Sequence, residues 1–89
     1  MAGPGTLRLL YFAWLRERLG TAEEVVALPE GVATVGDLLI WLCSRSPAHA
    51  EAFSAAFRVR CAVNQEFAAP DAPVAAGDEV AFFPPVTGG

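Results

Sequence analysis

The two most apolar strand-like segments of this chain lie at its opposite ends. Residues 6–13 (TLRLLYFA) and 79–83 (EVAFF) follow the two-residue period of a β-strand, and most positions in both phases are apolar. A strand that is apolar in both phases is typical of one buried on both faces at the centre of a sheet. The first and last strands are therefore expected to be neighbours there, with the remainder of the chain supplying flanking strands and a helical cover.

One segment has the period of an amphipathic helix. Its apolar residues recur at i, i+3, i+4 and i+7 and form a single stripe: Val35, Leu38, Leu39 and Leu42. Thr34 followed three residues later by Asp37 predicts an N-cap close to a capping box, with Asp in place of Glu. Gly36 puts a weak helix former in the first turn, at a cost of up to about 1 kcal/mol against Ala. This is the principal helix.

Two large residues, Ile40 and Trp41, lie off that stripe. They are either covered by a following segment or form an exposed patch for a partner. Ser46 and Pro47 can cap and begin a second short helix that runs through about Phe57, because proline is favoured in the first helical turn. The Ala-rich run of this helix is a candidate for the cover.

The remaining segments are shorter. A helical turn is expected over residues 14–19, followed by a glycine cap, and strands over 23–28, 59–63 and weakly 66–69. A sheet with one main helix packed across one face is an α+β arrangement, and with the terminal strands at its centre it is a β-grasp with a mixed sheet. The expected organisation is a lead-in over residues 1–5, a β-grasp domain over 6–85 and an extended tail over 86–89.

Composition excludes several classes of protein. A chain of 89 residues that is 54% hydrophobic is one small packed domain. Its net charge of −4 disfavours nucleic acid, and its longest apolar runs are far shorter than a membrane span. No secretory signal is visible, so a cytoplasmic protein is expected. With one histidine, His49, no metal site is expected, and Cys43 and Cys61 are interpreted as reduced, buried thiols.

The last residues of the chain are the candidate reactive group. Pro84 and Pro85 end the final strand and project the remaining residues stiffly outward, since proline cannot donate to a sheet. Val86 to Gly89 then reach about 13–14 Å if fully extended. Glycine has no side chain to block a narrow channel, so the Gly89 carboxylate can enter another protein's active site.

These segments together resemble a known family. The similarity covers most of the chain and is carried by LYFA at 10–13 with Arg16-Glu17, by Thr34-Val35, by AVNQ at 62–65 and above all by GDEVAFFPPVTGG at 77–89. The chain resembles the small, sulfur-carrying subunit of molybdopterin synthase, a ubiquitin-like β-grasp protein. The terminal motif is long and ordered, so it is the most specific of these matches.

The resemblance implies acyl chemistry at Gly89, with Gly88 beside it. An E1-like adenylating enzyme uses ATP to activate the carboxylate, and sulfur from a persulfide replaces AMP to give a thiocarboxylate. The thiocarboxylate then gives its sulfur to a cyclic pyranopterin precursor in the large synthase subunit. The carrier is therefore expected to bind no cofactor and to need no catalytic side chain of its own.

The resemblance also implies the contact residues and the assembly. Phe83, Phe67 and Arg16 are expected to bind the partner, together with the exit segment Pro84, Pro85, Val86 and Thr87. Two small and two large subunits would form a heterotetramer. From the residues alone, Phe83 could equally be a second core layer, Phe67 could fold back over the sheet, and Arg16 could be a solvated charge beside Glu17.

Other functions share the same terminal chemistry. The chain could serve thiamine or tRNA thiolation as a ubiquitin-like sulfur carrier, or it could be a protein modifier joined to lysines of other proteins. A β-grasp interaction module with an inert tail is a further interpretation. The FFPPVTGG ending favours the synthase subunit, because the surface that leads into the tail decides which partner is bound.

Overall fold

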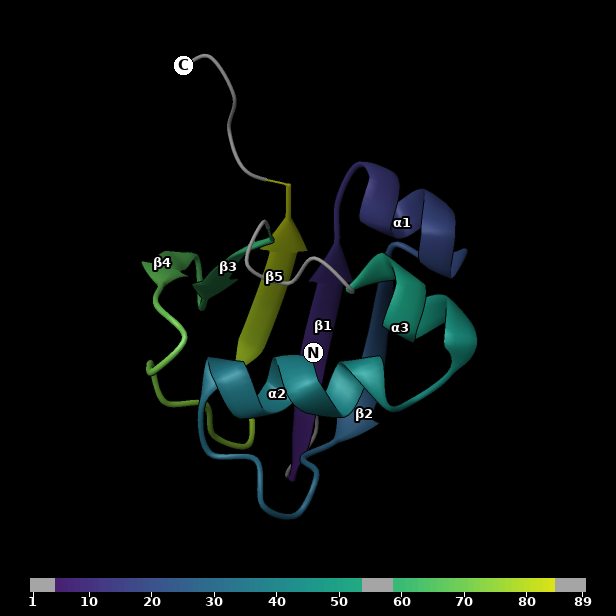
Figure 1. Cartoon of the computed structure of the whole chain (residues 1–89). Helices are drawn as coiled ribbons and strands as arrows, with labels where there is room; N and C mark the ends of the chain where they lie inside the picture. Colours follow the sequence, from purple (N-terminus) through teal and green to yellow (C-terminus); the bar gives the residue numbers. More distant parts are fainter. Residues whose placement is uncertain (1–4, 54–58, 85–89) are drawn as a thin grey trace.

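The computed structural model describes residues 5–53 and 59–84 and shows a sheet covered by helices (Figure 1). The strands are β1 (Thr6–Tyr11), β2 (Glu23–Ala27), β3 (Arg60–Val63), β4 (Glu66–Ala68) and β5 (Glu79–Phe83). The helices are α1 (Trp14–Leu19), α2 (Val35–Cys43) and α3 (Pro47–Ala52). This order of elements agrees with the α+β expectation.

The sheet has the order β2-β1-β5-β3-β4. Strands β1 and β5 are parallel neighbours, with Leu10 opposite Ala81 and Tyr11 opposite Phe82, whereas the other pairs are antiparallel. The central pairing of the first and last strands is thus confirmed. A mixed sheet with α2 lying across it is the ubiquitin-like β-grasp fold that was expected (Figure 1).

One face of the sheet forms the core with the helices. Every second residue of β1 is buried, namely Leu7, Leu9 and Tyr11. They share one apolar cluster with Val80 and Phe82 of β5 and with the buried stripe of α2. Each fully buried side chain of this size stabilises the fold by about 1.5–3 kcal/mol.

The other face of the sheet corrects one expectation. Strand β1 was expected to be buried on both faces, but Leu10 is only half-buried and the Phe12 side chain that comes after the strand is 48% exposed. The buried residues of the described helices all belong to the cluster on the opposite face, so no helix in the described ranges covers this one. A central strand in a sheet with antiparallel pairs does not need two covered faces. We call this uncovered side the open face.

The start of α2 agrees closely with the sequence pattern. Thr34 Oγ1 accepts from the backbone N–H of Asp37, and the Asp37 carboxylate accepts from the backbone N–H of Thr34, so a complete capping box is present. Gly36 lies against another loop, and its N–H donates to the carbonyl of Pro70 at 2.8 Å. A Cβ at this position would lie 3.2 Å from the same oxygen. A side chain at position 36 would therefore force these two closely approaching segments to shift.

The α3 helix differs from expectation in what it covers. Ser46 caps it and Pro47 begins it, as predicted, and the described helix ends at Ala52, while residues 54–58 lie outside the described ranges. Phe53 enters the core, where its ring lies 5.4 Å from that of Phe82. Ile40 stays 72% exposed, so it belongs to the surface. Trp41 is half-buried beneath the Arg45 guanidinium, 4.9 Å from its ring.

Two observations bear on membranes and metals. In residues 5–53 and 59–84, no helix is long and apolar enough to cross a membrane. Over the same residues, no group of three or more His, Cys, Asp or Glu side chains is arranged to bind a metal ion.

Candidate functional site

The chain leaves the sheet from its centre. Strand β5 ends at Phe83, between β1 on one side and β3 on the other, and Pro84 is the last described residue. The expected reactive end, Gly88 and Gly89, and the exit residues Pro85, Val86 and Thr87 lie outside the described residues. The site that the structure does define is the surface around this exit.

The two aromatic residues expected to bind the partner lie together. The rings of Phe67 and Phe83 are 5.8 Å apart with an interplanar angle of 61°, an edge-to-face arrangement. Phe67 comes from β4 and is 82% exposed, whereas Phe83 comes from the end of β5 and is half-buried. Phe67 therefore does not fold back into the core, and Phe83 does not form a second buried layer.

Strand register places both rings on the open face. Ala62 of β3 lies opposite Phe67 on one side and opposite Ala81 on the other, and directly opposed residues point to the same face. On this face Leu10, Ala81, Ala62 and Phe67 lie directly opposite one another in a row across four strands. With the other apolar residues of the face they form what we call the open-face patch: Leu10, Phe12, Val25, Ala62, Phe67, Ala81 and Phe83.

Arg60 and five members of the open-face patch were not expected as partner contacts from the sequence: Leu10, Phe12, Val25, Ala62 and Ala81. Leu10 and Phe12 share one phase of the β1 alternation, which was visible, but both phases of that strand were expected to be buried. Val25 and Arg60 join the face through pairing with distant strands, opposite Arg8 and Phe83 respectively. That pairing carries no local sequence signal.

A pocket extends the patch around the edge of the sheet. It has a volume of about 630 Å³ and lies between α2 and the β3–β4 edge. Phe67, Phe83 and Arg60 line it on one side, and Val35 and Leu39 of α2 line it on the other. A mainly apolar hollow beside two exposed rings is suited to receive a side chain from another protein.

Arg16 occupies a different part of the exit. It is exposed on α1, which comes directly after β1, whereas Phe67 lies on β4, three strands further along the sheet. Adjacent strands are about 4.8 Å apart, so the two residues flank the exit from opposite sides and do not form one cluster.

The two thiols and the histidine are at least half-buried and contact other parts of the fold. Burial raises the pKa of the Cys61 thiol to about 12, so it stays protonated near neutral pH. Cys43 is half-buried, not fully buried as expected, and its thiol lies 3.6 Å from the carbonyl oxygen of Phe53. His49 Nδ1 lies 2.8 Å from the Ser46 hydroxyl in α3. Within the described residues, these groups supply no nucleophile at the tail exit.

The fold and the exit together define a ubiquitin-like β-grasp protein whose last strand ends beside an exposed aromatic patch. The sequence model of the ThiS family matches residues 9–89, and the chain belongs to the ThiS family.

Relatives and solved structures agree with this assignment. The chain is 43% identical over 84 residues to the molybdopterin synthase sulfur carrier subunit of Escherichia coli (strain K12), with 93% of this chain and 99% of that protein covered. It is similar to the structure of small archaeal modifier protein 1 of Haloferax volcanii, with 34% identity, a TM-score of 0.72 and coverage of 92% and 99%.

A more distant structure shares the fold. It is a complex of subunits 1 and 2 of molybdopterin-converting factor from Helicobacter pylori, with 16% identity, a TM-score of 0.62 and coverage of 94% of this chain and 99% of the matched one.

Proposed function

We propose that this chain is a sulfur carrier in molybdenum cofactor biosynthesis and that its Gly89 carboxylate becomes the thiocarboxylate that donates the sulfur. The observation that carries the proposal is the nearly full-length similarity to the sulfur carrier subunit of molybdopterin synthase from Escherichia coli. The open-face patch at the tail exit supports it, because a tail of a few residues needs an adjacent surface to hold a specific complex.

The chemistry at Gly89 proceeds in balanced steps. The carboxylate attacks the α-phosphate of ATP, pyrophosphate leaves, and an acyl adenylate forms with a good leaving group. A persulfide sulfur then attacks the acyl carbon and displaces AMP, and a thiol cleaves the resulting acyl disulfide to release the thiocarboxylate. The carrier contributes a slim, accessible terminus, and the partner enzymes contribute ATP binding and the sulfur donor.

The acceptor is a cyclic pyranopterin monophosphate bound by a large synthase subunit. Two sulfur transfers to this precursor give the dithiolene that holds the metal. The large subunit docks on the open-face patch, with Phe83 and Phe67 as aromatic anchors and Arg16, Pro84, Pro85, Val86 and Thr87 along the exit. The complex from Helicobacter pylori, in which a chain of this fold is assembled with a second subunit, supports such docking. The assembly has two small and two large subunits.

An intact-mass measurement tests the carrier role. The purified chain is incubated with an E1-like adenylating enzyme, ATP and a sulfur donor. The expected product is heavier by one oxygen-to-sulfur exchange, which fragmentation places on the C-terminal peptide. Sulfur found on Cys43 or Cys61 instead would overturn the proposal.

A second candidate is a protein modifier, and the similarity to a small archaeal modifier protein favours it. The activated Gly89 would then form isopeptide bonds with lysines of other proteins. Affinity purification of the tagged chain under denaturing conditions separates the two functions. A ladder of covalent conjugates joined through Gly89 supports the modifier, whereas a free thiocarboxylate without conjugates supports the carrier.

A carrier for thiamine or tRNA thiolation would instead transfer its sulfur to those acceptors and not to the pyranopterin.

A further inference from the structure

The arginines of this chain fall into two groups. The six basic residues are all arginine, and three of the five described ones form ion pairs. Arg8 pairs with Glu23 and Glu79, Arg18 pairs with Glu51, and Arg45 pairs with Glu24. Within residues 5–53 and 59–84, Arg16 and Arg60 make no ion pair or side-chain hydrogen bond, and both are exposed.

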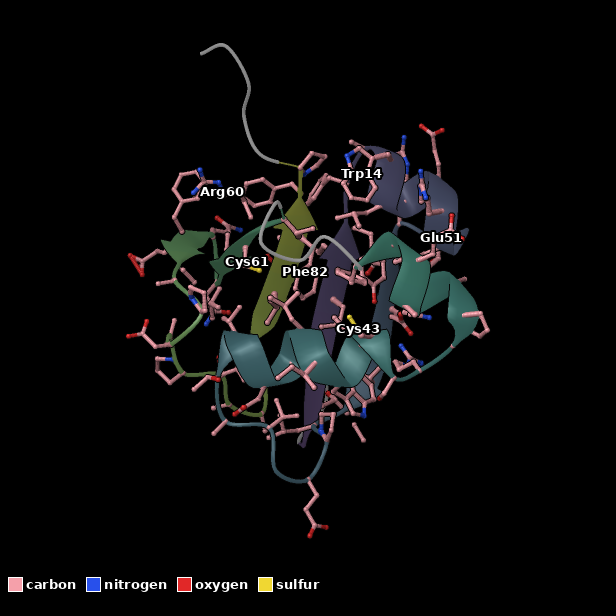
Figure 2. All side chains as sticks on the ribbon, viewed as in Figure 1. Trp14, Cys43, Glu51, Arg60, Cys61 and Phe82 are labelled. Carbon is pink, nitrogen blue, oxygen red and sulfur yellow. The ribbon has the colours of Figure 1, made fainter. Side chains whose placement is uncertain are left out.

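These two unpaired arginines lie on either side of the tail exit. Arg60 is directly opposite Phe83 in the β3–β5 ladder, and Phe83 ends the last strand. Arg16 lies on α1, which comes directly after β1 on the other side of β5. Figure 2 shows Arg60 and Trp14, the first residue of α1, on opposite sides of the end of β5.

Docking at the open-face patch would remove Arg60 from water. Directly opposed residues in an antiparallel pair have Cβ atoms about 4.5–5.5 Å apart, so a partner that covers the Phe83 ring also covers the base of the Arg60 side chain. Arg60 also lines the pocket beside the two rings. A guanidinium desolvated without a counter-charge is costly, so a stable complex requires a partner group that compensates it.

We propose that the enzyme surface which receives the tail carries a carboxylate that pairs with Arg60. This inference rests on the proposed docking role of the open-face patch, and it adds Arg60 as a residue that decides which partners are accepted. The planar fork of arginine matches a carboxylate in two parallel hydrogen bonds, so the pair specifies orientation as well as charge.

The charge of the rest of the chain supports an acidic partner contact at this point. The chain carries a net charge of −4, and on the open face Arg8 is already neutralised by Glu23 and Glu79. An acidic partner surface is therefore repelled by the net charge of this molecule, and among the described arginines the unpaired Arg16 and Arg60 attract it to the exit. Such an arrangement orients the encounter so that the tail faces the channel.

Binding of the full chain to a large synthase subunit tests the proposal. The Kd is measured for the wild type and for Arg60→Ala, Arg60→Lys and Arg60→Glu, each with a melting temperature to confirm folding. Arg60→Ala is expected to raise the Kd at least about 10-fold, Arg60→Glu more, and Arg60→Lys less. The matched control is Arg18→Glu, which makes the same change in net charge on a residue already paired with Glu51, and it should change the Kd less than about 3-fold.

Several results would overturn the pairing. A folded Arg60→Glu variant that binds like the wild type excludes it, and an equal loss in Arg18→Glu shows a general charge effect. Inorganic phosphate or AMP at millimolar concentration could instead shift the Arg60 side-chain NMR signals and displace the large subunit. That result would assign Arg60 to binding a phosphate group and overturn the pairing with a carboxylate. Restoration of Arg60→Glu binding by an Asp→Lys or Glu→Lys change on the large subunit would identify the acidic partner directly.

The same experiment separates this inference from the proposed function. A wild-type chain that does not bind the large subunit at all removes the docking premise and both proposals with it. A wild-type chain that binds, with Arg60 variants that bind equally well, leaves the carrier function standing and removes only the acidic contact.

Discussion

Asn64 and Asp78 join two turns of the chain through their side chains. The Asn64 amide donates to Asp78 Oδ1 at 3.0 Å and its carbonyl oxygen accepts from the backbone N–H of Glu79 at 3.0 Å, while Asp78 Oδ2 accepts from the N–H of Ala75. Asn64 also has a positive φ of 51° in the β3–β4 turn. These contacts hold the β3–β4 turn against the turn that precedes β5, and so they align β3 with β5.

Asn64→Ala should therefore destabilise the fold although the residue is exposed. The change removes two hydrogen bonds and places Ala in the left-handed region, so we expect a loss of about 1–3 kcal/mol in the free energy of unfolding. Urea denaturation measures it. Glu66→Ala in the neighbouring exposed strand is the control, with an expected change below about 0.5 kcal/mol. Equal, small losses in both variants would show that the bridge contributes nothing.

Phe83→Ala and Phe82→Ala should have opposite effects, because adjacent residues of β5 point to opposite faces. Phe83 lies half-buried on the open face against Phe67, so its removal should weaken binding of the large subunit by roughly 1–3 kcal/mol and change stability less. Phe82 is fully buried between Tyr11 and Phe53, so its removal should cost about 3–5 kcal/mol of stability.

Affinity and melting temperature measured on both variants decide the matter. If Phe83→Ala melts as early as Phe82→Ala while its folded fraction binds normally, Phe83 belongs to the core and the partner binds another surface.

The terminal glycines should be dispensable for folding and required for sulfur transfer. In residues 5–53 and 59–84, every buried core residue lies between Leu7 and Phe82, so this core is complete without Gly88 and Gly89. The shortened chain is expected to melt within about 2 °C of the full chain and to accept no sulfur from the activating enzyme. A large fall in melting temperature would show that the tail is structural. Sulfur on the shortened chain would place the acceptor elsewhere.

Gly36→Ala provides a test in which helix propensity and packing disagree. Propensity alone predicts a gain of up to about 1 kcal/mol for Ala in a helix. The added Cβ would instead lie 3.2 Å from the Pro70 carbonyl oxygen that accepts the Gly36 N–H, so the loop must move. We expect a net loss of about 1 kcal/mol by urea denaturation. A more stable Ala variant would show that the loop yields freely.

Local sequence patterns predicted where the strands and helices lie better than they predicted which side chains are buried. The period of two placed β1 and β5, and Thr34 with Asp37 placed the start of α2, because these signals lie within a few residues of each other. The open face was not predicted, since Leu10 and Phe12 are as apolar as Leu9 and Tyr11. Which phase of β1 is buried depends on the face of the sheet against which the helices pack.

The resemblance named two residues of the candidate site in advance. Residues that join the site only through the pairing of distant strands were not predicted. Phe67 and Phe83 were named separately, and the structure shows that their rings pack against each other. Arg60 could not be placed beside Phe83 without the β3–β5 register, and Gly36 could not be explained without the approach of Pro70. Both facts depend on contacts between segments more than 20 residues apart.

Glu24 should make the stability of the fold depend on pH in the acid range. Burial alone would raise the pKa of this carboxyl, but hydrogen bonds from the Tyr11 hydroxyl at 2.6 Å and from Arg45 at 2.8 Å outweigh it, with further help from the Arg45 charge. The pKa in the folded state is therefore held below its ordinary value of 4.5. A carboxyl with a lowered pKa stabilises the fold above the pKa of the unfolded chain, and this contribution is lost as the pH falls through the folded-state value.

The Glu24→Gln variant isolates that contribution. At pH 7 it should be less stable than the wild type by about 1–3 kcal/mol, because the charged acceptor for Tyr11 and Arg45 is gone. As the pH falls below about 4.5, the wild type should lose stability faster than the variant, so that the two curves approach each other. The stability of Tyr11→Phe, which removes one donor and keeps the ring, should lie between those of the wild type and Glu24→Gln at pH 7. The unfolding free energies of both proteins are measured from pH 7 to pH 3. If the two curves stay parallel, the Glu24 carboxyl titrates alike in the folded and unfolded chains, and the expectation is wrong.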